Sequence, residues 1–217
     1  FPENPILVYR PFHLNERNYL YLADRGRIYG DVRLFDDQGT GIHFYTNRED
    51  TIADQEMTVE LSRIDLKQFK KVLPYLPDVE GWLGGSLHYV DSEGQMMLSA
   101  DMNLDNFVYE KSPLGNWAMS GAYLPGDNNA HHVDGFITYS DQEIIYMNGV
   151  YQADETGQEN ITGELELQHF PLRVINPFIP EKMVAFTGDI DGTLSMTGSP
   201  MKPVLNGGLQ LDSVLMI

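Results

Sequence analysis

Two adjacent histidines, His131 and His132, are the residues of this sequence that most invite a metal-binding interpretation. Imidazole nitrogens are common ligands of Zn²⁺ and other transition metals. The pair follows the turn-forming run 125–129. Adjacent residues of a strand point to opposite faces, so one ion could not easily reach both side chains. We therefore predict a solvated loop at this position and no metal site.

A second candidate is the run Asp189-Ile190-Asp191-Gly192, which has the beginning of a calcium-binding loop. Such a loop needs a third acidic position and a distal Glu, and both are missing here. We expect the two carboxylates to lie on the polar face of a strand.

Motifs for catalysis are missing as well. Paired carboxylates can hydrolyse glycosides when an apolar pocket raises the pKa of one of them, but no local motif singles out a pair among the 32 acidic residues. The sequence contains no Gly-x-Ser-x-Gly, His-Glu-x-x-His, phosphate-binding glycine loop or dinucleotide fingerprint. It has no Cys, which excludes thiol catalysis and thiolate metal sites. We predict that the chain is not an enzyme and needs no cofactor.

The charge of the chain argues against nucleic acid and anionic membranes as partners. The 217 residues include 14 Lys and Arg and 32 Asp and Glu, for a net charge of −18. Residues 1–71 carry 10 basic and 12 acidic side chains, and residues 72–217 carry 4 and 20. Proteins that bind phosphate backbones or anionic headgroups need a basic surface. No stretch approaches the roughly 18 to 20 apolar residues of a membrane-spanning helix.

Alternating apolar and polar residues dominate the sequence and predict half-buried β-strands. One face of the run 98–104 is apolar and the other is polar, and the same period recurs at 57–61, 165–167, 190–196 and 205–211. Turn-forming clusters such as 36–39 and 91–94 separate these runs. The pattern predicts an all-β fold in which antiparallel hairpins follow one another.

Two segments depart from this pattern and predict short helices. Apolar residues recur at three to four positions in Leu66–Leu76 and Leu172–Ile179, and each segment is bounded by prolines. Their apolar faces need a partner, so we expect both helices to lie across the apolar side of the sheet, with Phe69 and Phe178 packed against it.

An internal repeat organises the sequence. Residues 57–109 match residues 161–217, at an offset of 103 for Pro74–Pro77 and Pro177–Pro180 and, after four inserted residues, at an offset of 107 for Gly85 and Gly192 and for Leu98 and Leu205. Each copy contains a strand, a short helix and two further strands, and such units usually stack into an array. The chain starts at Phe1 rather than Met and its last residues have a strand pattern. We therefore expect one β-rich fragment, 1–217, of a longer repeat protein.

Both copies change the parity of their apolar residues near the end of the last strand. The change follows Asp105-Asn106 in one copy and Asp212-Ser213 in the other. One extra residue in a strand has this effect, so we predict a β-bulge at each place, where the sheet should curl.

A curled sheet with one apolar face would form a trough able to hold acyl chains, each buried methylene contributing about 0.8 kcal/mol. We expect an elongated, strongly curved sheet with an open apolar groove. The alternative is a closed β-sandwich that binds a protein or a glycan at its surface, and a glycosidase-type enzyme ranks third. The predicted groove-lining residues share strand parity within each copy; they are Leu98, Met102, Leu104, Leu194, Met196, Leu205, Leu209 and Leu211.

The second copy also resembles a known family. The run 170–180, with Pro177-Phe178-Ile179-Pro180, is followed by Gly188-Asp189-Ile190-Asp191-Gly192, Thr197-Gly198-Ser199-Pro200-Met201-Lys202-Pro203 and Leu205-Asn206-Gly207. This order is similar to the translocation and assembly module subunit TamB of the AsmA-like superfamily, in the version of Bacteroides-type bacteria. The resemblance covers about 50 residues closely. The copy at 57–109 matches more loosely and lacks the Pro-x-x-Pro before its last strand.

The resemblance implies a long periplasmic protein that is anchored in the inner membrane. It implies a half-pipe of β-strands with an apolar interior, called a β-taco, and a role in outer-membrane biogenesis. The implied partners are a TamA-type barrel protein of the outer membrane and, as cargo, phospholipid acyl chains or nascent outer-membrane proteins. The family has no catalytic residues to carry over to this chain.

Overall fold

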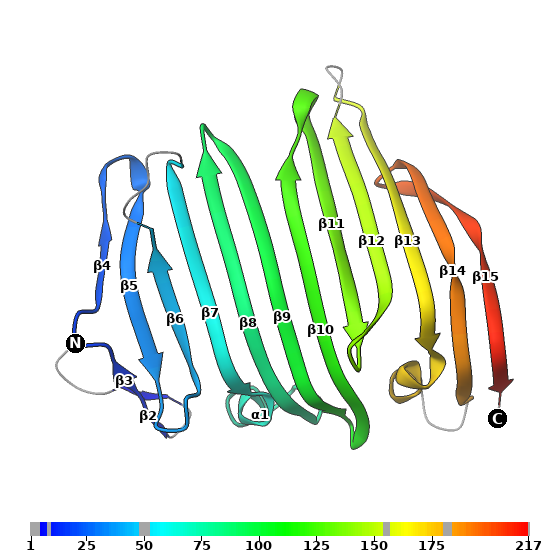
Figure 1. Cartoon of the computed structure of the whole chain (residues 1–217), viewed down its shortest axis with the longest axis horizontal. Helices are drawn as coiled ribbons and strands as arrows, with labels where there is room; N and C mark the ends of the chain where they lie inside the picture. The colour runs from blue at the N-terminus through cyan, green and yellow to red at the C-terminus, as the bar shows by residue number, and fades with distance from the viewer. Residues whose placement is uncertain (1–4, 8–9, 48–52, 154–156, 180–183, 217) are drawn as a thin grey trace. The chain divides into compact units, whose positions relative to one another are not determined.

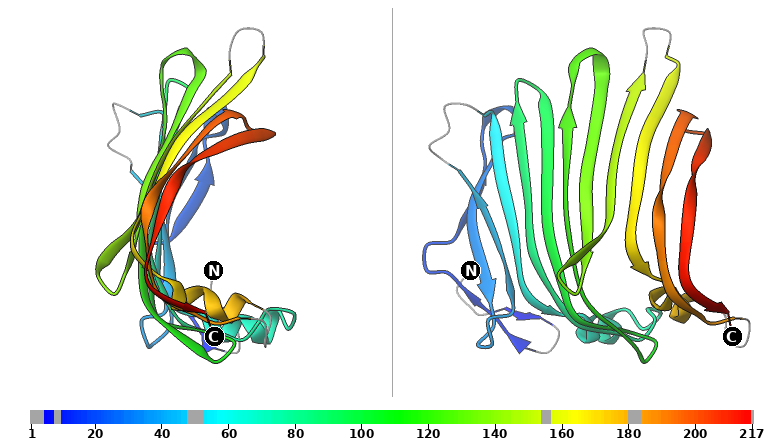
Figure 2. Two further views of the ribbon diagram at one scale, coloured as in Figure 1. Left: turned by 90° about the vertical axis from the view of Figure 1, so that its right-hand side faces the viewer. Right: turned by 45° about the vertical axis from the view of Figure 1, so that its right-hand side comes forward.

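The computed structural model describes residues 5–7, 10–47, 53–153, 157–179 and 184–216. The chain divides into two compact units, 1–113 and 114–217, with the boundary inside one strand. Each unit is built on antiparallel β-strands with short helical segments (Figure 1, and in two further views Figure 2). The all-β class and the antiparallel arrangement are therefore as predicted.

Unit 1 contains one large antiparallel sheet and a separate two-stranded pair. The large sheet has the strand order β9-β8-β7-β6-β5-β3, with β4 also paired to β5. The elements of this unit are β1 (Ile6–Leu7), β2 (Arg10–Pro11), β3 (His13–Leu14), β4 (Tyr19–Leu22), η1 (Asp24–Gly26), β5 (Ile28–Phe35), β6 (Gly41–Thr46), β7 (Gln55–Asp65), η2 (Leu66–Gln68), α1 (Phe69–Val72), β8 (Val79–Ser92) and β9 (Gln95–Tyr109).

Unit 2 is a simple meander in which each strand pairs with the next along the chain, in the order β10 to β15. Its elements are β10 (Ser112–Pro125), η3 (Asp127–Asn129), β11 (Ala130–Tyr139), β12 (Gln142–Ala153), β13 (Glu159–Pro171), η4 (Leu172–Phe178), β14 (Phe186–Ser199) and β15 (Lys202–Met216). A two-residue hairpin with a type I′ turn needs positive φ at both central residues, and Ser140-Asp141 between β11 and β12 meets this with φ of 50° and 65°.

The strand register gives the sheet of unit 2 one apolar and one polar face. Met147 on β12 lies opposite Leu165 on β13, which lies opposite Leu194 on β14. One residue along, Asn148 lies opposite Glu164, which lies opposite Ser195. Successive residues of a strand point to opposite faces, so the sequence alternation is translated directly into two unlike surfaces. No second sheet is formed by the described residues of this unit.

The two predicted β-bulges are present. The register between β8 and β9 shifts at Asn106, which has φ of 52°, and the register between β14 and β15 shifts at Ser213, which has φ of 53°. The structure adds three register shifts that the sequence interpretation did not include. Two lie at Arg63 in β7 and His169 in β13, with φ of 48° and 46°. The third lies between Ile137 and Thr138, where β11 pairs with β12.

The same order of elements occurs within 57–109 and within 161–217: a strand, a short helical segment and two strands. Gly85 and Gly192, which the sequence aligned, both have extended backbone with positive φ, 133° and 150°. The repeat itself stays a prediction of the sequence. Pro180, which completes the Pro-x-x-Pro motif of the second copy, lies outside the described residues.

The helical segments begin where the sequence predicted them, but neither expected anchor is buried: Phe69 is 41% exposed, and Phe178 is more exposed still. The carboxylate of Asp65 caps η2 by accepting from the Lys67 amide. In η4, Phe178 is 58% exposed, whereas Leu172 and Val174 are buried. Burial is concentrated in the first turn, where η4 leaves β13, so the segment is held at its start rather than at Phe178. Asn176 adds two hydrogen bonds to the backbone of Phe186.

This distribution of burial predicts unequal effects of two truncations. Leu172→Ala should lower the free energy of unfolding by about 2–3 kcal/mol, because it leaves a cavity in a buried site. Phe178→Ala should cost less than about 1 kcal/mol, because more than half of that side chain is already exposed. Urea unfolding of both variants checks this expectation, and equal losses would contradict it.

Candidate functional site

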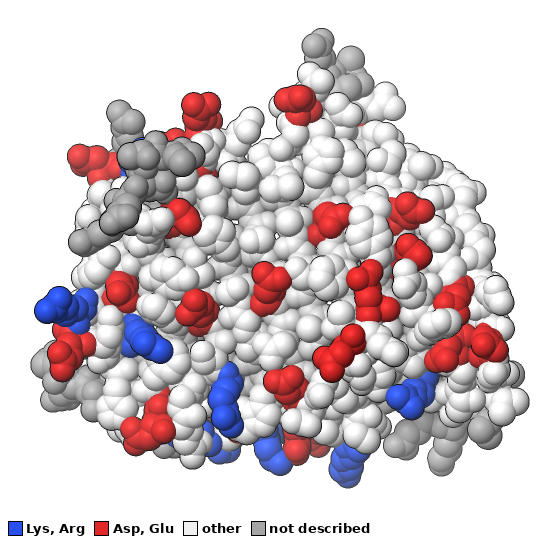
Figure 3. All heavy atoms as spheres, in the orientation of Figure 1, with Lys and Arg blue, Asp and Glu red and all other residues white. Residues whose placement is uncertain are grey.

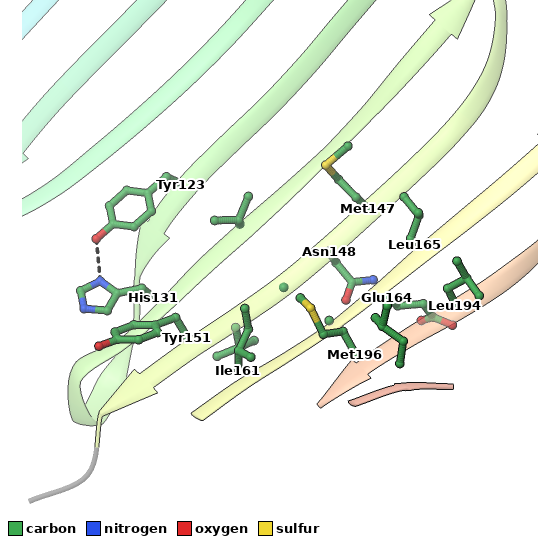
Figure 4. Close-up of a pocket in the computed structure, with 15 residues that line it drawn as sticks. Tyr123, His131, Met147, Asn148, Tyr151, Ile161, Glu164, Leu165, Leu194 and Met196 are labelled. Atoms are coloured by element: carbon green, nitrogen blue, oxygen red, sulfur yellow. Dashed lines mark hydrogen bonds between the residues drawn. The ribbon is translucent and has the colours of Figure 1, made fainter. Parts of the chain in front are cut away.

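A large open hollow lies on the apolar face of unit 2. It has a volume of about 770 Å³, within the range of about 300–1,000 Å³ that small-molecule sites occupy. Most of its lining side chains are apolar or aromatic and come from all six strands (Figure 4). The lining residues are Tyr123, His131, Val133, Met147, Asn148, Gly149, Val150, Tyr151, Ile161, Gly163, Glu164, Leu165, Leu194, Met196 and Leu205.

Two glycines make room at the centre of this face. Gly149 on β12 lies directly opposite Gly163 on β13, so no side chain stands between Val133 on one side and Met196 on the other. A Cβ at Gly149 would meet only one neighbouring atom, the Thr162 oxygen at 3.6 Å, which is ordinary contact. The space above this glycine is therefore open rather than filled by a neighbour.

One end of the hollow is aromatic and polar. The Tyr123 hydroxyl and His131 Nδ1 share a hydrogen bond of 2.6 Å, and the two rings stack with centroids 5.8 Å apart. The Tyr151 ring lies 5.7 Å from that of His131 on its other side. Tyr151 donates to Glu159. This hydrogen bond raises the pKa of Tyr151 above its ordinary value, because a phenolate would face the carboxylate.

The other end of the hollow is aliphatic. In Figure 4 Met147, Leu165 and Leu194 gather away from the three aromatic rings, with Ile161 and Met196 between the two groups. The hollow thus has an end built from aromatic and imidazole rings and an end built mainly from aliphatic side chains, with Asn148 and Glu164 beside the latter. That polarity suits an amphiphilic molecule better than a uniformly polar one.

The opposite face of unit 2 is acidic. Residues 114–217 contain 13 Asp and Glu and 3 Lys and Arg. Asp134, Glu166 and Asp191 have strand parity opposite to that of Leu194, and red side chains are spread over the face that Figure 3 shows. Tyr146 donates to Asp134, and this bond raises the pKa of the Tyr146 phenol. Glu164, the acidic residue that borders the hollow, pairs with Asn148 and Ser195 on this polar face.

The structure brings only some of the predicted groove-lining residues together. Leu194, Met196 and Leu205 line the hollow. Leu209 and Leu211 do not line it, although they continue the same face of β15, with 49% and 59% of their surface exposed. Leu98, Met102 and Leu104 belong to unit 1, where they share one face of β9.

The sequence interpretation missed the part of the hollow built by β10, β11 and β12. Tyr123, His131 and Tyr151 come from a segment outside both repeat copies. A signal was present, since Tyr123 and His131 flank the turn-forming run 125–129 at positions where a hairpin can bring two rings together. The third ring could be placed only with the β11–β12 register, which pairs His131 with Tyr151.

The prediction of a solvated histidine loop is wrong. His131 and His132 lie within β11, His131 is half-buried, and only His132 is exposed. They do face opposite sides of the sheet, because they are successive residues of one strand. The part of the chain that the structure describes contains no group of three His, Cys, Asp or Glu residues able to hold a metal ion.

The two carboxylates of the calcium-like run lie in β14, as predicted. Asp191 accepts hydrogen bonds from the backbone amide of His169, 2.8 Å away, and from its ring, 3.2 Å away. It therefore fixes the bulge at His169. Among the described residues, no helix is long and apolar enough to cross a membrane.

Comparison with known proteins gives no relative for this chain. No family model, no curated protein and no solved structure matches it. The chemistry of the hollow and the sequence resemblance are therefore the grounds on which a function can be argued.

Proposed function

We propose that this chain is a non-catalytic, periplasmic segment of a TamB-like outer-membrane biogenesis protein and that its apolar face holds phospholipid acyl chains. The observation that carries the proposal is the hollow of unit 2, which is large, open and apolar over most of its lining. The sequence resemblance of residues 170–207 supports the same interpretation.

The energetics of the hollow favour hydrocarbon over water. Its central floor is two glycine backbones bordered by Val133 and Met196. Such a surface offers water few hydrogen-bonding partners, whereas each methylene that enters contributes about 0.8 kcal/mol. The segment binds chains rather than transforming them, since it acts by removing apolar surface from water.

The curvature of the sheet into a half-pipe is also part of this proposal. The bulges at Asn106, His169 and Ser213 support a sheet that curves into a half-pipe, because each bulge adds local twist and bend. The full-length protein would be anchored in the inner membrane, and the half-pipe would lead toward a TamA-type barrel of the outer membrane.

A nascent outer-membrane protein is the second candidate cargo. Among the described strands, β15 is paired only with β14, and Leu205, Leu209 and Leu211 on it are all more than 45% exposed. An unpaired strand edge can accept an extended chain by strand addition. A closed sandwich is disfavoured because the described residues of unit 2 form a single sheet.

Photo-crosslinking in cells tests the proposal at neighbouring positions of β15. A benzophenone side chain at position 205 points to the apolar face and should capture radiolabelled phospholipid, whereas the same group at position 206 points to the other face and should capture at least tenfold less. Both residues are exposed, so accessibility is matched. Equal capture at both positions, or protein adducts alone at position 205, would contradict lipid as the cargo.

A further inference from the structure

The aromatic end of the hollow in unit 2 carries a row of polar atoms. In Figure 4 the hydroxyls of Tyr123 and Tyr151 and the ring nitrogens of His131 lie on the same side of the three rings. That side faces away from the aliphatic side chains of Met147 and Leu165. An amphiphile whose hydrocarbon covers the aliphatic end would therefore bring its polar group to this row.

His131 offers a hydrogen-bond donor to such a polar group. The Tyr123 hydroxyl lies 2.6 Å from His131 Nδ1 and has no other acceptor among the described residues. The hydroxyl therefore donates to Nδ1, and the proton of the neutral imidazole lies on Nε2. Nε2 has no partner within the described part of the chain, so its N–H can donate to an oxygen of a bound molecule.

One carboxylate shares the face of the hollow. Among the acidic residues on the described strands of unit 2, Glu159 alone has the strand parity of the lining residue Ile161. Glu164 also borders the hollow, but its parity directs it to the opposite face, together with Asn148 and Ser195. The apolar face therefore has a single negative charge, which lies at its aromatic end.

No described residue neutralises this charge. The Oε1 atom of Glu159 accepts from the Tyr151 hydroxyl at 3.0 Å, and the carboxylate forms no ion pair with a described residue. Lys202 is the one Lys or Arg on the described strands of unit 2, and its parity is opposite to that of Leu205, which lines the hollow. A cation bound at this end would be attracted to Glu159, and an anion would be repelled.

We infer that this end of the hollow is a headgroup site for phospholipids that carry an ammonium group. The inference rests on the proposed function for phospholipid as the class of ligand and adds the headgroup. The ammonium lies beside the Glu159 carboxylate, and a phosphate oxygen accepts from His131 Nε2. The acyl chains continue over Ile161 and Met196 to the aliphatic end.

Isothermal titration calorimetry of the whole chain with three lipids tests this inference. The lipids are dioctanoyl phosphatidylethanolamine, its N-acetyl derivative and dioctanoyl phosphatidylglycerol, which share their acyl chains and phosphate and differ in the ammonium. The Kd for phosphatidylethanolamine should be about fivefold lower than the other two, the upper range for an exposed ion pair. Glu159→Gln should abolish this preference by weakening phosphatidylethanolamine binding alone, and Glu159→Lys should reverse it.

Glu166→Gln is the matched control. Glu166 lies on the same strand as Glu159 but has the opposite parity, and it pairs with Tyr146 on the polar face. The variant loses the same charge and should keep the preference for phosphatidylethanolamine. An equal loss of preference in Glu166→Gln would mean that the net charge of the chain selects the headgroup, and would overturn the inference.

His131→Phe tests the other half of the site, because it keeps a ring and removes the donor. All three lipids contain the phosphate, so all three should bind about threefold to tenfold more weakly, as expected for the loss of one hydrogen bond. Their order of affinity should not change. Unchanged affinities for all three lipids in this variant would overturn the inference.

The remaining outcomes separate this inference from the proposed function. Equal affinity of the unaltered chain for the three lipids, or tighter binding of phosphatidylglycerol, would remove the headgroup site and leave the proposed function standing, because acyl chains would still be bound. Binding of none of the three lipids would overturn both.

Discussion

Gly192→Ala should lower the free energy of unfolding by about 3–5 kcal/mol, one of the largest effects that a single methyl group can have in this chain. Gly192 has φ of 150°, a conformation that residues with a Cβ rarely adopt. A Cβ there would lie 2.2 Å from the carbonyl oxygen of Gly208 on β15, a backbone atom that cannot move without breaking the β14–β15 ladder. Urea unfolding measures the loss.

Gly208→Ala is the matched control for this prediction. Gly208 lies on the facing strand, is exposed and has no atom within 4 Å of the position that its Cβ would occupy. Its replacement should change the free energy of unfolding by less than about 1 kcal/mol. Similar losses in the two variants would mean that the close approach of β14 and β15 is not what requires glycine at position 192.

Gly149→Leu should abolish most lipid binding while the fold persists. The new side chain would stand on the apolar face between Val133 and Gly163, and its Cβ would have only an ordinary contact at 3.6 Å. It would displace roughly four methylene groups of a bound chain, a loss of about 3 kcal/mol or about a hundredfold in affinity. Titration with a fluorescent phospholipid measures this loss.

Thr162→Leu provides the control on the other face. Thr162 is exposed on β13, and its strand parity is opposite to that of Ile161 and Gly163, which line the hollow, so its side chain points to the other face. The variant gains the same apolar bulk and should bind the lipid as the unaltered chain does. Comparable losses in both variants would place the bound lipid elsewhere than above Gly149.

The features that could be predicted from the sequence are those that depend on the residues of a single strand. Alternation along 98–104 and 205–211 predicted strands, and the change of parity after Asn106 and Ser213 predicted their bulges. At His169 the evidence was one apolar residue, Phe170, just before a helix, and a single residue does not establish a parity. The bulge there is defined by pairing with β14, including the contact of His169 with Asp191.

Features that depend on register between strands could not be predicted. The hollow exists because Gly149 faces Gly163 and because Tyr123, His131 and Tyr151 meet across three strands. Neither arrangement can be recognised from a single segment of the sequence. The prediction that Phe178 is buried failed for a related reason. The spacing of apolar residues predicts a helix, but it does not show which turn of that helix packs against the sheet.

Native mass spectrometry of the purified chain tests the central claim, that the apolar face of unit 2 holds acyl chains, most directly. The chain should retain phospholipid from the expressing cells, visible as mass adducts that dissociate into intact lipids. Gly149→Leu should lose most of these adducts, and Thr162→Leu should keep them. A lipid-free unaltered chain, or adducts that are equally abundant in Gly149→Leu, would contradict the claim.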